Sequence, residues 1–385
     1  MPLKVAKRGN VPPFIVMDVM RAANERAATG ATVLHLEVGQ PGTPAPRPVI
    51  EAAKKALESD NIGYTDASGR PSLRRRIARH YRDRYGVDID PARIMVTSGS
   101  SGGFLLSFLA CFDAGDRVAL AAPGYPAYRN ILSTLGVEPV LLLTDAEHRF
   151  QPTLELIDQV MGQGDKPLDG LIVASPSNPT GTMLGRTELS HLIEGCRARG
   201  IRVISDEIYH GITYGEPAVS ALELGDDAVI VNSFSKYFSM TGWRLGWLVL
   251  PEELIRPVEC LGQNLFISAP TISQYAGEAA FDCVPEADAY VAAYARSRAL
   301  LLKELPGAGF DRLAPADGAF YIYADVRHLS NDSEAFCRRM LAETGVASTP
   351  GTDFDPERGN GYVRFSFAAA EAEIAEAVRR LRAWS

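Results

Sequence analysis

The sequence has few cysteines, few lysines and no long apolar run. Its five cysteines are scattered over 385 residues and lack the C-x-x-C spacing of zinc sites, so they indicate neither a disulfide framework nor a metal centre. We expect them to be small core residues in a reducing compartment. The N-terminal stretch MPLKVAKRGNVPP lacks the apolar segment of a signal peptide, and no apolar run reaches the roughly 18 residues of a membrane span. We therefore expect a cytoplasmic protein.

The charge balance is mildly acidic. A net charge of −8 argues against general nucleic-acid binding, and 46% hydrophobic with 22% charged residues is ordinary for a soluble globular protein. The basic run LRRR at residues 73–76 leads into IARHYRDRYG, where Leu73, Ile77 and Tyr81 recur at helical spacing. This pattern predicts a helix whose arginines face solvent.

Residues 90–250 alternate between short aliphatic runs and helical stretches such as 102–112 and 186–199. Strands that alternate with helices predict an α/β domain with a mostly parallel, seven-stranded sheet between helices. Ligands of such sheets bind beyond the carboxyl ends of the strands. The expected strands are 94–98, 117–121, 139–143, 170–174, 201–205, 228–232 and 246–250.

The pattern changes near residue 284 and predicts a smaller α+β domain. We expect an N-terminal segment 1–46 that packs with this small domain, a large domain 47–284, and the small domain 285–385. The elements expected in the small domain are helices 286–305, 333–344 and 371–384 and strands 318–324 and 362–367.

Lysine is scarce, and one of the seven lysines has unusual neighbours. Lys236 lies in SFSKYFSMTGWRLGW, residues 233–247, among apolar, aromatic and hydroxyl side chains. Burial favours the neutral form of an amine, which is the nucleophilic form and can make a Schiff base with an aldehyde. The alternative is a lysine whose amine reaches solvent from a helix end.

Two motifs suit a phosphate group. In VTSGSSGGF, residues 96–104, a strand ends, a Gly/Ser loop follows and a helix begins, so backbone N–H groups and the hydroxyls of Ser100 and Ser101 can bind a phosphate. The alternative is a glycine-rich connection with a serine cap. Arg244 can add bidentate hydrogen bonds to the phosphate, or make a structural ion pair.

Three further motifs place polar side chains near strand ends. Asn178 lies in the rigid turn SPSNPTG, where it either donates to a ligand or caps its own turn. Asp206 and Tyr209 lie in SDEIY, where the carboxylate either pairs with a cationic nitrogen of a ligand or caps a helix. Arg364, flanked by apolar residues in YVRFSF, either binds a carboxylate ligand or forms a buried ion pair.

Together these motifs match the needs of pyridoxal 5′-phosphate: an amine for its aldehyde, an acid for its ring nitrogen, donors for its phenolic oxygen and a phosphate cup. Their order, from GQP through SNPTG, DEIY, SFSK and TGWRLGW to VRFSF, resembles the class I/II aminotransferases of fold type I, the aspartate-aminotransferase-like family. The resemblance covers nearly the whole chain. It implies a pyridoxal-phosphate-dependent transaminase that works by a ping-pong mechanism.

The resemblance implies a role for each cofactor-binding residue, with Lys236, Asp206 and Tyr209 as the catalytic residues. Lys236 binds the aldehyde as a Schiff base and moves the proton between the substrate α-carbon and the cofactor C4′. Asp206 pairs with the ring nitrogen, Asn178 and Tyr209 bind the phenolic oxygen, and Tyr125 stacks on the ring. The remaining cofactor contacts, around the phosphate, are Ser100, Ser101, Gly102, Ser233 and Arg244.

The resemblance also implies the substrate contacts and a homodimer with shared active sites. Arg364 binds the substrate α-carboxylate together with Asn178, and the backbone of Gly39 closes over it. Tyr64 matches a tyrosine that reaches the cofactor phosphate of the neighbouring subunit. In this family the stretch VPPFIVMDV closes over the substrate side chain, and here Phe14 and Ile15 make it apolar.

We therefore expect a neutral or hydrophobic amino acid as one substrate, since no second arginine is identified for a side-chain carboxylate. Aspartate transamination remains an alternative, as does a β-lyase or decarboxylase reaction on the same fold. A non-catalytic transcription regulator would need a DNA-binding domain ahead of this fold. A dinucleotide-binding enzyme would need G-x-G-x-x-G in a βαβ context, which the sequence lacks.

Overall fold

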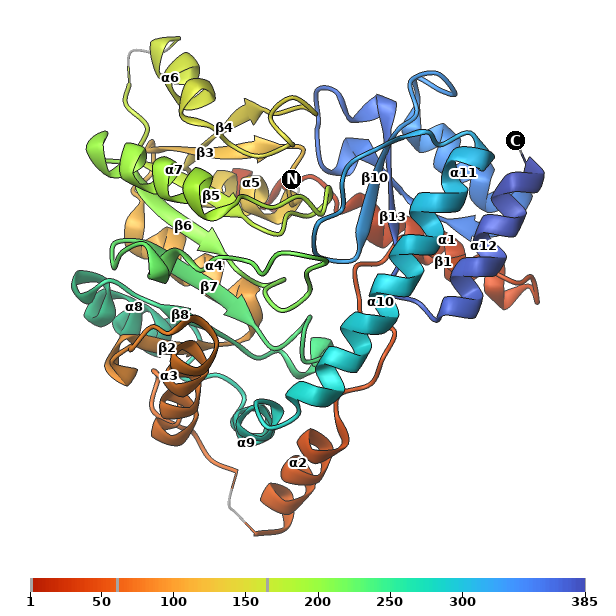
Figure 1. Cartoon of the computed structure of the whole chain (residues 1–385). Coiled ribbons are helices and arrows are strands. Elements are labelled where there is room, and N and C mark those ends of the chain that lie inside the picture. The colour runs from red at the N-terminus through yellow and green to blue at the C-terminus, as the bar shows by residue number, and fades with distance from the viewer. Residues whose placement is uncertain (1–2, 60–61, 164–165, 385) are drawn as a thin grey trace.

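The computed structural model describes residues 3–59, 62–163 and 166–384 (Figure 1). The helices are α1 Ile15–Ala28, α2 Arg47–Ser59, α3 Pro71–Tyr85, α4 Gly99–Cys111, α5 Pro126–Leu135, α6 Leu154–Gly162, α7 Arg186–Ala198, α8 Glu252–Leu265, α9 Thr271–Ala280, α10 Val284–Glu304, α11 Ser333–Thr344 and α12 Glu371–Trp384. The strands are β1 Leu34–His35, β2 Ile94–Thr97, β3 Arg117–Ala122, β4 Glu138–Leu143, β5 Gly170–Ala174, β6 Arg202–Asp206, β7 Val229–Ser233, β8 Gly246–Val249, β9 Arg312–Leu313, β10 Tyr321–Asp325, β11 Val346–Ala347, β12 Thr349–Pro350 and β13 Tyr362–Ser366.

The described residues form a central seven-stranded sheet in the order β2-β8-β7-β6-β5-β3-β4. Its neighbours pair in parallel except at β8, which is antiparallel to both β2 and β7. All seven predicted strands are present, with ends within one residue of those expected. The predicted fold class, an α/β protein with a mostly parallel sheet between helices, is therefore confirmed.

The sheet is buried on both faces. In β3, Val118 and Leu120 lie in one core cluster with residues of α4, α5 and α8, whereas Ala119 lies in a second cluster with residues of α3, α6 and α7. Successive side chains of a strand point to opposite faces, so a strand covered on both sides must be apolar throughout. This explains the continuous aliphatic runs of the sequence.

The helix predicted around the LRRR run is α3. Leu73, Ile77 and Tyr81 are fully buried in the core cluster beneath it. Arg70, just before the helix, and Arg76 within it pair with acids of the α9 region, Glu278 and Asp282, at 3.0 and 2.9 Å. Of the arginines in the run, Arg75 is exposed whereas Arg74 and Arg76 are half-buried, so the amphipathic helix is confirmed but its arginines face solvent only in part.

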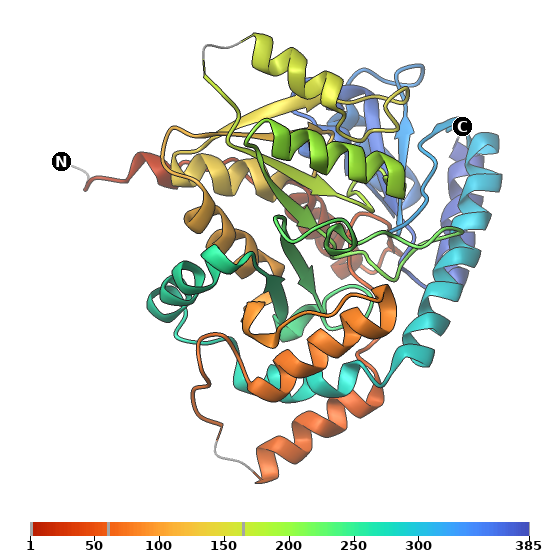
Figure 2. The same ribbon diagram turned by 60° about the vertical axis from the view of Figure 1, so that its left-hand side comes forward.

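A second, antiparallel sheet in the order β12-β13-β10-β9 lies beside the first, and the long helix α10 runs along both parts of the molecule (Figure 2). The predicted strand 318–324 begins later, at Tyr321, because Ala316 and Ala319 adopt positive φ angles of 52° and 56° and turn the chain first. Near the N-terminus, β1 pairs in parallel with β11. The division into three segments stays a prediction, and its ends at residues 1–2 and 385 lie outside the described residues.

Within the described part of the chain, no helix is both long enough and apolar enough to cross a membrane. All five cysteines are free thiols, and three of them are buried.

Candidate active site

A cavity of about 220 Å³ opens at the edge of the sheet where the parallel strands end. Ala174 is the last residue of β5 and Asp206 the last of β6, and both line it. Other walls come from the start of α4, the N-terminal helix α1 and the second sheet. Its lining residues are Phe14, Val16, Met17, Val38, Gly39, Ser100, Ser101, Phe104, Tyr125, Tyr128, Ala174, Asn178, Asp206, Ile208, Tyr209, Ser235, Lys236, Thr241, Arg244, Tyr321 and Arg364.

Lys236 follows β7 and points its amine into this cavity. Its Nζ donates to the backbone oxygen of Gly39 at 2.5 Å and lies 5.8 Å from the ring centres of Tyr209 and Phe320. Burial lowers the pKa of Lys236 to about 8, assisted by the positive charge of Arg364. A larger share of the amine is therefore neutral near physiological pH than for an exposed lysine, as a nucleophile requires.

Asp206 is a buried carboxylate, 5% exposed, at the floor of the cavity. It accepts hydrogen bonds from the Tyr128 hydroxyl and, at 3.1 Å, from the backbone N–H of Ile208. Burial raises the pKa of Asp206 to about 6 even though both donors favour its charged form. No cation forms an ion pair with this carboxylate in the part of the chain that the structure describes. Its charge is therefore available for a cationic ligand atom.

The amino end of α4 and Arg244 form an anion site. The helix begins at Gly99, three residues earlier than expected, so Ser100 and Ser101 lie in its first turn, where backbone N–H groups have no partner within the helix. Gly99 has a φ of +72°, and a Cβ there would lie 2.6 Å from an Arg244 Nη. Arg244 itself donates to the Thr241 backbone oxygen at 3.0 Å. These donors suit a phosphate group.

Arg364 of β13 is a buried cation whose hydrogen-bond partners are neutral groups. Its Nη1 donates to Asn178 Oδ1 at 2.7 Å, and its Nη2 donates to the Glu37 backbone oxygen and to Thr349 Oγ1. Its Nε is buried without a hydrogen-bond partner among the described residues. A buried guanidinium without a carboxylate is costly, so this site fits an anionic ligand group. The Oδ1 of Asn178 is used in this contact, which leaves its Nδ2 amide as the donor toward a ligand.

Tyr209 and Tyr321 share a hydrogen bond of 2.6 Å between their hydroxyls. Burial raises the pKa of both, so both stay protonated at neutral pH. The Arg364 guanidinium lies 4.4 Å from the Tyr321 ring centre. A side chain at Gly39 would collide with the Tyr321 hydroxyl, so the residue 39 backbone can approach the cavity only as glycine.

Four residues predicted from the sequence are not in the cavity wall. Ser233 is buried: its hydroxyl donates to Leu245 O at 3.0 Å and lies at hydrogen-bond distance, 2.9 Å, from Ser235 Oγ. Ser235 is the serine that faces the cavity. Gly102 lies inside α4, and Ile15 begins α1 beside the wall residues. Tyr64 is 82% exposed on the surface. The roles of these four residues stay predictions.

Two tyrosines of the cavity wall were not predicted from the sequence. Tyr128 lies one turn along α5 from Tyr125, and i, i+3 residues of a helix share a face, so the pair in GYPAY carried a weak signal. Tyr321 begins β10, and nothing in its local sequence links it to Tyr209. Only the packing of the second sheet against the first brings these two hydroxyls together.

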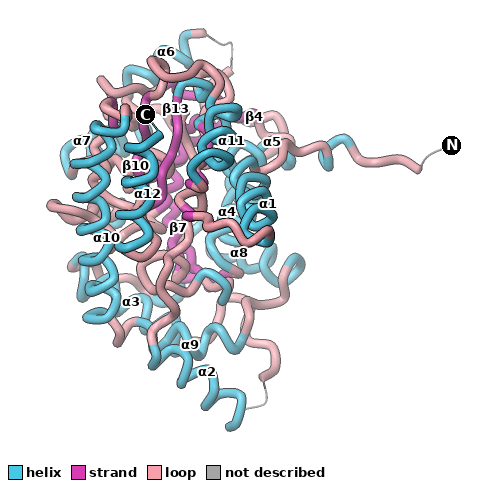
Figure 3. The backbone as a smooth tube through the Cα atoms, turned by 90° about the vertical axis from the view of Figure 1, so that its right-hand side faces the viewer, coloured by secondary structure: helices cyan, strands magenta, loops and turns pink. Residues whose placement is uncertain are grey.

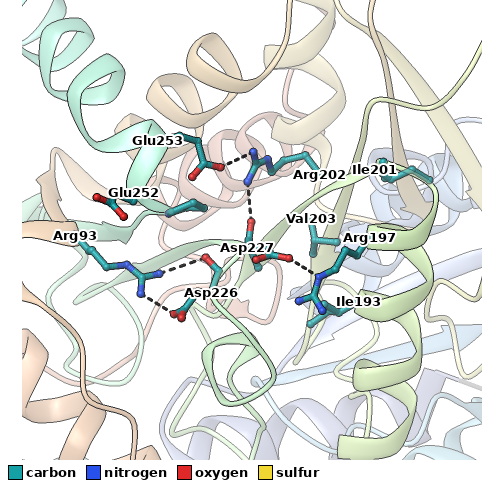
Figure 4. Close-up of a pocket in the computed structure, with 13 residues that line it drawn as sticks. Arg93, Ile193, Arg197, Ile201, Arg202, Val203, Asp226, Asp227, Glu252 and Glu253 are labelled. Atoms are coloured by element: carbon teal, nitrogen blue, oxygen red, sulfur yellow. Dashed lines mark hydrogen bonds and ion pairs between the residues drawn. The ribbon is translucent and has the colours of Figure 1, made fainter.

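A larger cavity of about 490 Å³ lies at the opposite edge of the sheet, where β6 and β7 begin (Figure 4). Its charged residues pair with one another: Arg93 with Asp226 at 2.6 Å, and Arg202 with Glu253 at 2.8 Å. A lysine is absent from the wall that the described residues form there. This cavity has the greater volume, but the arginines of its wall already pair with acids of the same wall, so none is left as an unpaired donor for a ligand.

The smaller cavity fits pyridoxal phosphate. Three features match three groups of the cofactor and substrate. The Nε of Arg364, which has no partner, suits the substrate carboxylate, and the carboxylate of Asp206 suits the ring nitrogen. The space that Gly99 leaves beside Arg244 suits the phosphate. Lys236 lines the same cavity. Three other cavities, lined in part by Arg93, by His148 and by Phe310, have no lysine among the described residues of their walls.

Comparisons with known proteins agree with this chemistry. Residues 31–381 match the family model of aminotransferase class I and II. A protein named valine–pyruvate aminotransferase from Mycobacterium tuberculosis is 52% identical over 385 residues, which cover 99% of this chain and 98% of that protein.

Two solved structures are similar over their whole length. An aminotransferase from Mycobacterium tuberculosis has a TM-score of 0.96 at 51% identity and covers 100% of this chain and 99% of its own. Aspartate aminotransferase from Thermus thermophilus with maleate has a TM-score of 0.91 at 30% identity, over 99% of this chain and 100% of that one. With this match in sequence, fold and site chemistry, the chain belongs to the class I and II aminotransferases and is a pyridoxal-phosphate-dependent enzyme of that family.

Proposed function

We propose that this aminotransferase takes the amino group from a neutral or hydrophobic L-amino acid and transfers it to a 2-oxo acid by a ping-pong mechanism. One observation carries the proposal: within the described residues, the cavity wall contains two arginines, Arg244 and Arg364. The first suits the cofactor phosphate and the second the substrate α-carboxylate. No arginine remains for a side-chain carboxylate.

The part of the wall left for the substrate side chain is apolar. It consists of Phe14, Val16, Met17 and Val38 from the N-terminal region. An apolar wall stabilises a valine or leucine side chain and leaves a second carboxylate without a partner. The relative named valine–pyruvate aminotransferase supports this choice, whereas the similarity to an aspartate aminotransferase keeps aspartate in the test.

In the proposed mechanism the residues of the chain bind, orient and move protons. Bound pyridoxal phosphate supplies an aldehyde and an electron-withdrawing ring that stabilises negative charge at the substrate α-carbon. Lys236 Nζ would bind the cofactor through its aldehyde, and as a neutral amine it would move the proton between the substrate α-carbon and the cofactor C4′. Asp206 holds a proton at the cofactor ring nitrogen, and Arg364 orients the substrate by its carboxylate.

Tyr209 and Asn178 would donate to the phenolic oxygen of the cofactor. Tyr321 can donate its own proton to the Tyr209 oxygen, which turns the Tyr209 proton toward the cavity. Tyr125, whose ring lines the cavity, would cover the cofactor ring. Its hydroxyl stays protonated, since burial raises the pKa of Tyr125 to about 12.

The proposal includes a homodimer in which Tyr64 reaches the phosphate of the partner's cofactor. Tyr64 is 82% exposed and lies outside the cavity of its own chain, and the apolar Leu265 and Ile267 are 48% and 49% exposed. Thr271 Oγ1 donates to Gly63 O at 2.6 Å, which joins the Tyr64 segment to the start of α9. Residues 3–6 extend away from the body, as an arm on a partner would (Figure 3). Sedimentation velocity should give a dimer.

The location proposed for the enzyme is the cytoplasm. The five free thiols support a reducing compartment, because disulfides form and persist in oxidising ones.

The test is a panel of amino donors with 2-oxoglutarate and with pyruvate as acceptors. We expect valine, leucine, methionine or alanine to react with a kcat/KM at least about tenfold above that of aspartate. The side-chain carboxylate of aspartate would be buried at this wall without a partner, which lowers its kcat/KM. Donor alone should convert the bound cofactor to its amine form. Aspartate ahead of every neutral donor would reject the substrate class, and ammonia with pyruvate released from a cysteine-like donor would indicate a lyase.

A further inference from the structure

Asp353 is a buried carboxylate that lies outside the cavity wall. It bonds to the backbone of α1, the helix that carries apolar residues of that wall. It ends the short 3-10 helix Gly351–Asp353 that follows β12, and it is 1% exposed. Its Oδ1 accepts from the backbone N–H of Ile15 at 3.1 Å, and its Oδ2 accepts from that of Val16 at 3.2 Å. No cationic side chain bonds to this carboxylate among the described residues.

These hydrogen bonds replace a cap that α1 lacks. Phe14 occupies the N-cap position of α1, and its apolar side chain makes no capping bond. The first N–H groups of a helix have no partner within it, and a carboxylate there also interacts favourably with the helix dipole. Asp353 therefore caps a helix that begins 338 residues earlier in the chain.

The same loop is fixed to the segment that carries Tyr125. Arg129 Nη2 donates to the Asp353 backbone oxygen at 2.7 Å, and Gly124 N–H donates to Phe354 O at 3.0 Å. These two donors flank Tyr125 and the start of α5. The ring of Phe14 meets the ring of Tyr125 edge-on, with 5.7 Å between their centres. The loop thus holds α1 and the β3–α5 connection in one arrangement.

We propose that Asp353 is a positioning residue for substrate selectivity: by capping α1, it holds Phe14, Val16 and Met17 as the wall against which an apolar substrate side chain packs. The inference rests on the proposed function and names the residue that maintains its pocket. The branched side chain of valine extends further toward this wall than the single methyl group of alanine. Loss of the cap therefore weakens the reaction of valine more than that of alanine.

The test compares half-reaction rates of the holoenzyme with valine and with alanine, without an oxo acid. We expect Asp353→Ala to lower kcat/KM for valine about tenfold, mainly through KM. This factor is of the same order as the loss of helix stability when a cap residue is replaced by alanine. The value for alanine should fall less than about threefold. Asp353→Asn keeps one acceptor, so we expect an intermediate loss of the valine-to-alanine ratio, and it decides the question if Asp353→Ala does not fold.

Asp332→Ala is the matched control. Asp332 caps α11 through Ala335 N–H at 2.9 Å, on a helix that contributes no residue to the cavity wall. It should leave the valine-to-alanine ratio unchanged. In the cofactor-free protein, hydrogen exchange of the first-turn amides of α1 should be faster in Asp353→Ala than in wild type, while Asp332→Ala leaves it unchanged.

An unchanged ratio in both Asp353 variants, or an equal loss for both donors, overturns the proposal. Its failure is distinct from failure of the proposed function. A wild-type enzyme that prefers aspartate rejects the substrate class, while the exchange of the α1 amides still shows whether Asp353 holds the helix.

Discussion

The two edges of the central sheet carry cavities that differ in the state of their charges. At the edge where β6 and β7 begin, arginines and acids of the larger cavity pair with one another, as Arg93 does with Asp226. At the edge where these strands end, Lys236, Asp206 and Arg364 are buried without such pairs. Unpaired buried charge, rather than volume, therefore distinguishes the cavity that we propose as the active site.

The physical reason is the cost of burial. Paired charges near the surface contribute about 0–1 kcal/mol each and serve mainly to join loops. Burying a charge without an ionic partner costs several times more free energy. A ligand of opposite charge can offset this cost, or the pKa of the group can shift so that the group becomes neutral. At the carboxyl edge, the pKa values of Lys236 and Asp206 are moved toward the neutral forms. The hydrogen bonds that Arg364 donates go to neutral groups, which leaves this cation for an anionic ligand.

The largest expected effect follows from removing the amine of the carboxyl-edge site. Lys236→Ala should lower transamination by at least about a thousandfold, because it removes both the cofactor link and the proton-transfer group. Borohydride reduction followed by mass spectrometry should show covalent cofactor in wild type and none in the variant. Thermal unfolding of the cofactor-free protein should change little.

Lys303→Ala is the control for this experiment, since its side chain is 80% exposed. It should leave both covalent labelling and activity unchanged.

Because burial lowers the pKa of Lys236 to about 8, labelling of the cofactor-free protein should become faster as the pH rises from 7 to 9 and the neutral amine forms. A Lys236→Ala enzyme with wild-type activity would reject the whole assignment of this cavity.

A smaller effect is expected from the hydrogen bond that supports Asp206. Tyr128 donates to the charged form of this carboxylate, so it holds the pKa of Asp206 lower than burial alone would. Tyr128→Phe should raise that pKa further above about 6 and move the acid limb of the kcat/KM profile to higher pH. Near pH 6.5 we expect cofactor affinity to fall about tenfold, as for a hydrogen bond to a charged group, with a smaller loss at pH 8.

Tyr85→Phe is a suitable comparison, because the Tyr85 hydroxyl is also buried but bonds to His210 Nδ1 at 2.9 Å, away from the cavity. It should leave the pH profile in place. If Tyr128→Phe keeps the wild-type profile, the hydrogen bond does not tune Asp206.

The smallest effect is expected at the amino-edge cavity. Arg202→Ala removes a pair with Glu253 at 2.8 Å in which the side chains are 29% and 60% exposed, and a bond to the Asp227 backbone oxygen. The free energy of unfolding, measured with urea, should fall by less than about 1 kcal/mol. kcat/KM should not change. A tenfold loss of kcat/KM at unchanged stability would show that the two edges are coupled, and would break the distinction between them.

Much of the fold could be predicted because local patterns specify it. Strands buried on both faces must be apolar throughout, so β5 and β6 are visible as aliphatic runs. The motifs that hold Lys236, Asp206 and Asn178 directly follow such strands, and strand ends at one edge bring them together.

The rest of the site depends on segments that are distant in sequence. Tyr321 reaches Tyr209, and Asp353 reaches Ile15, only through the packing of the second sheet, and neither contact leaves a pattern in the chain. Ser233 and Ser235 are two residues apart, and which of them faces the cavity depends on the turn after β7. The strand β10 begins late because two alanines adopt positive φ, a conformation that alanine rarely takes.

The cap on α1 has a consequence for biosynthesis. The helix that completes the substrate wall is made among the first residues, whereas its carboxylate partner belongs to the last tenth of the chain. Until that part has left the ribosome, the first N–H groups of α1 lack their acceptor, and β1 likewise lacks its partner β11. Such distant contacts slow folding and leave apolar surface open to aggregation or chaperones. We therefore expect the proposed substrate wall to be completed in one of the final steps of folding.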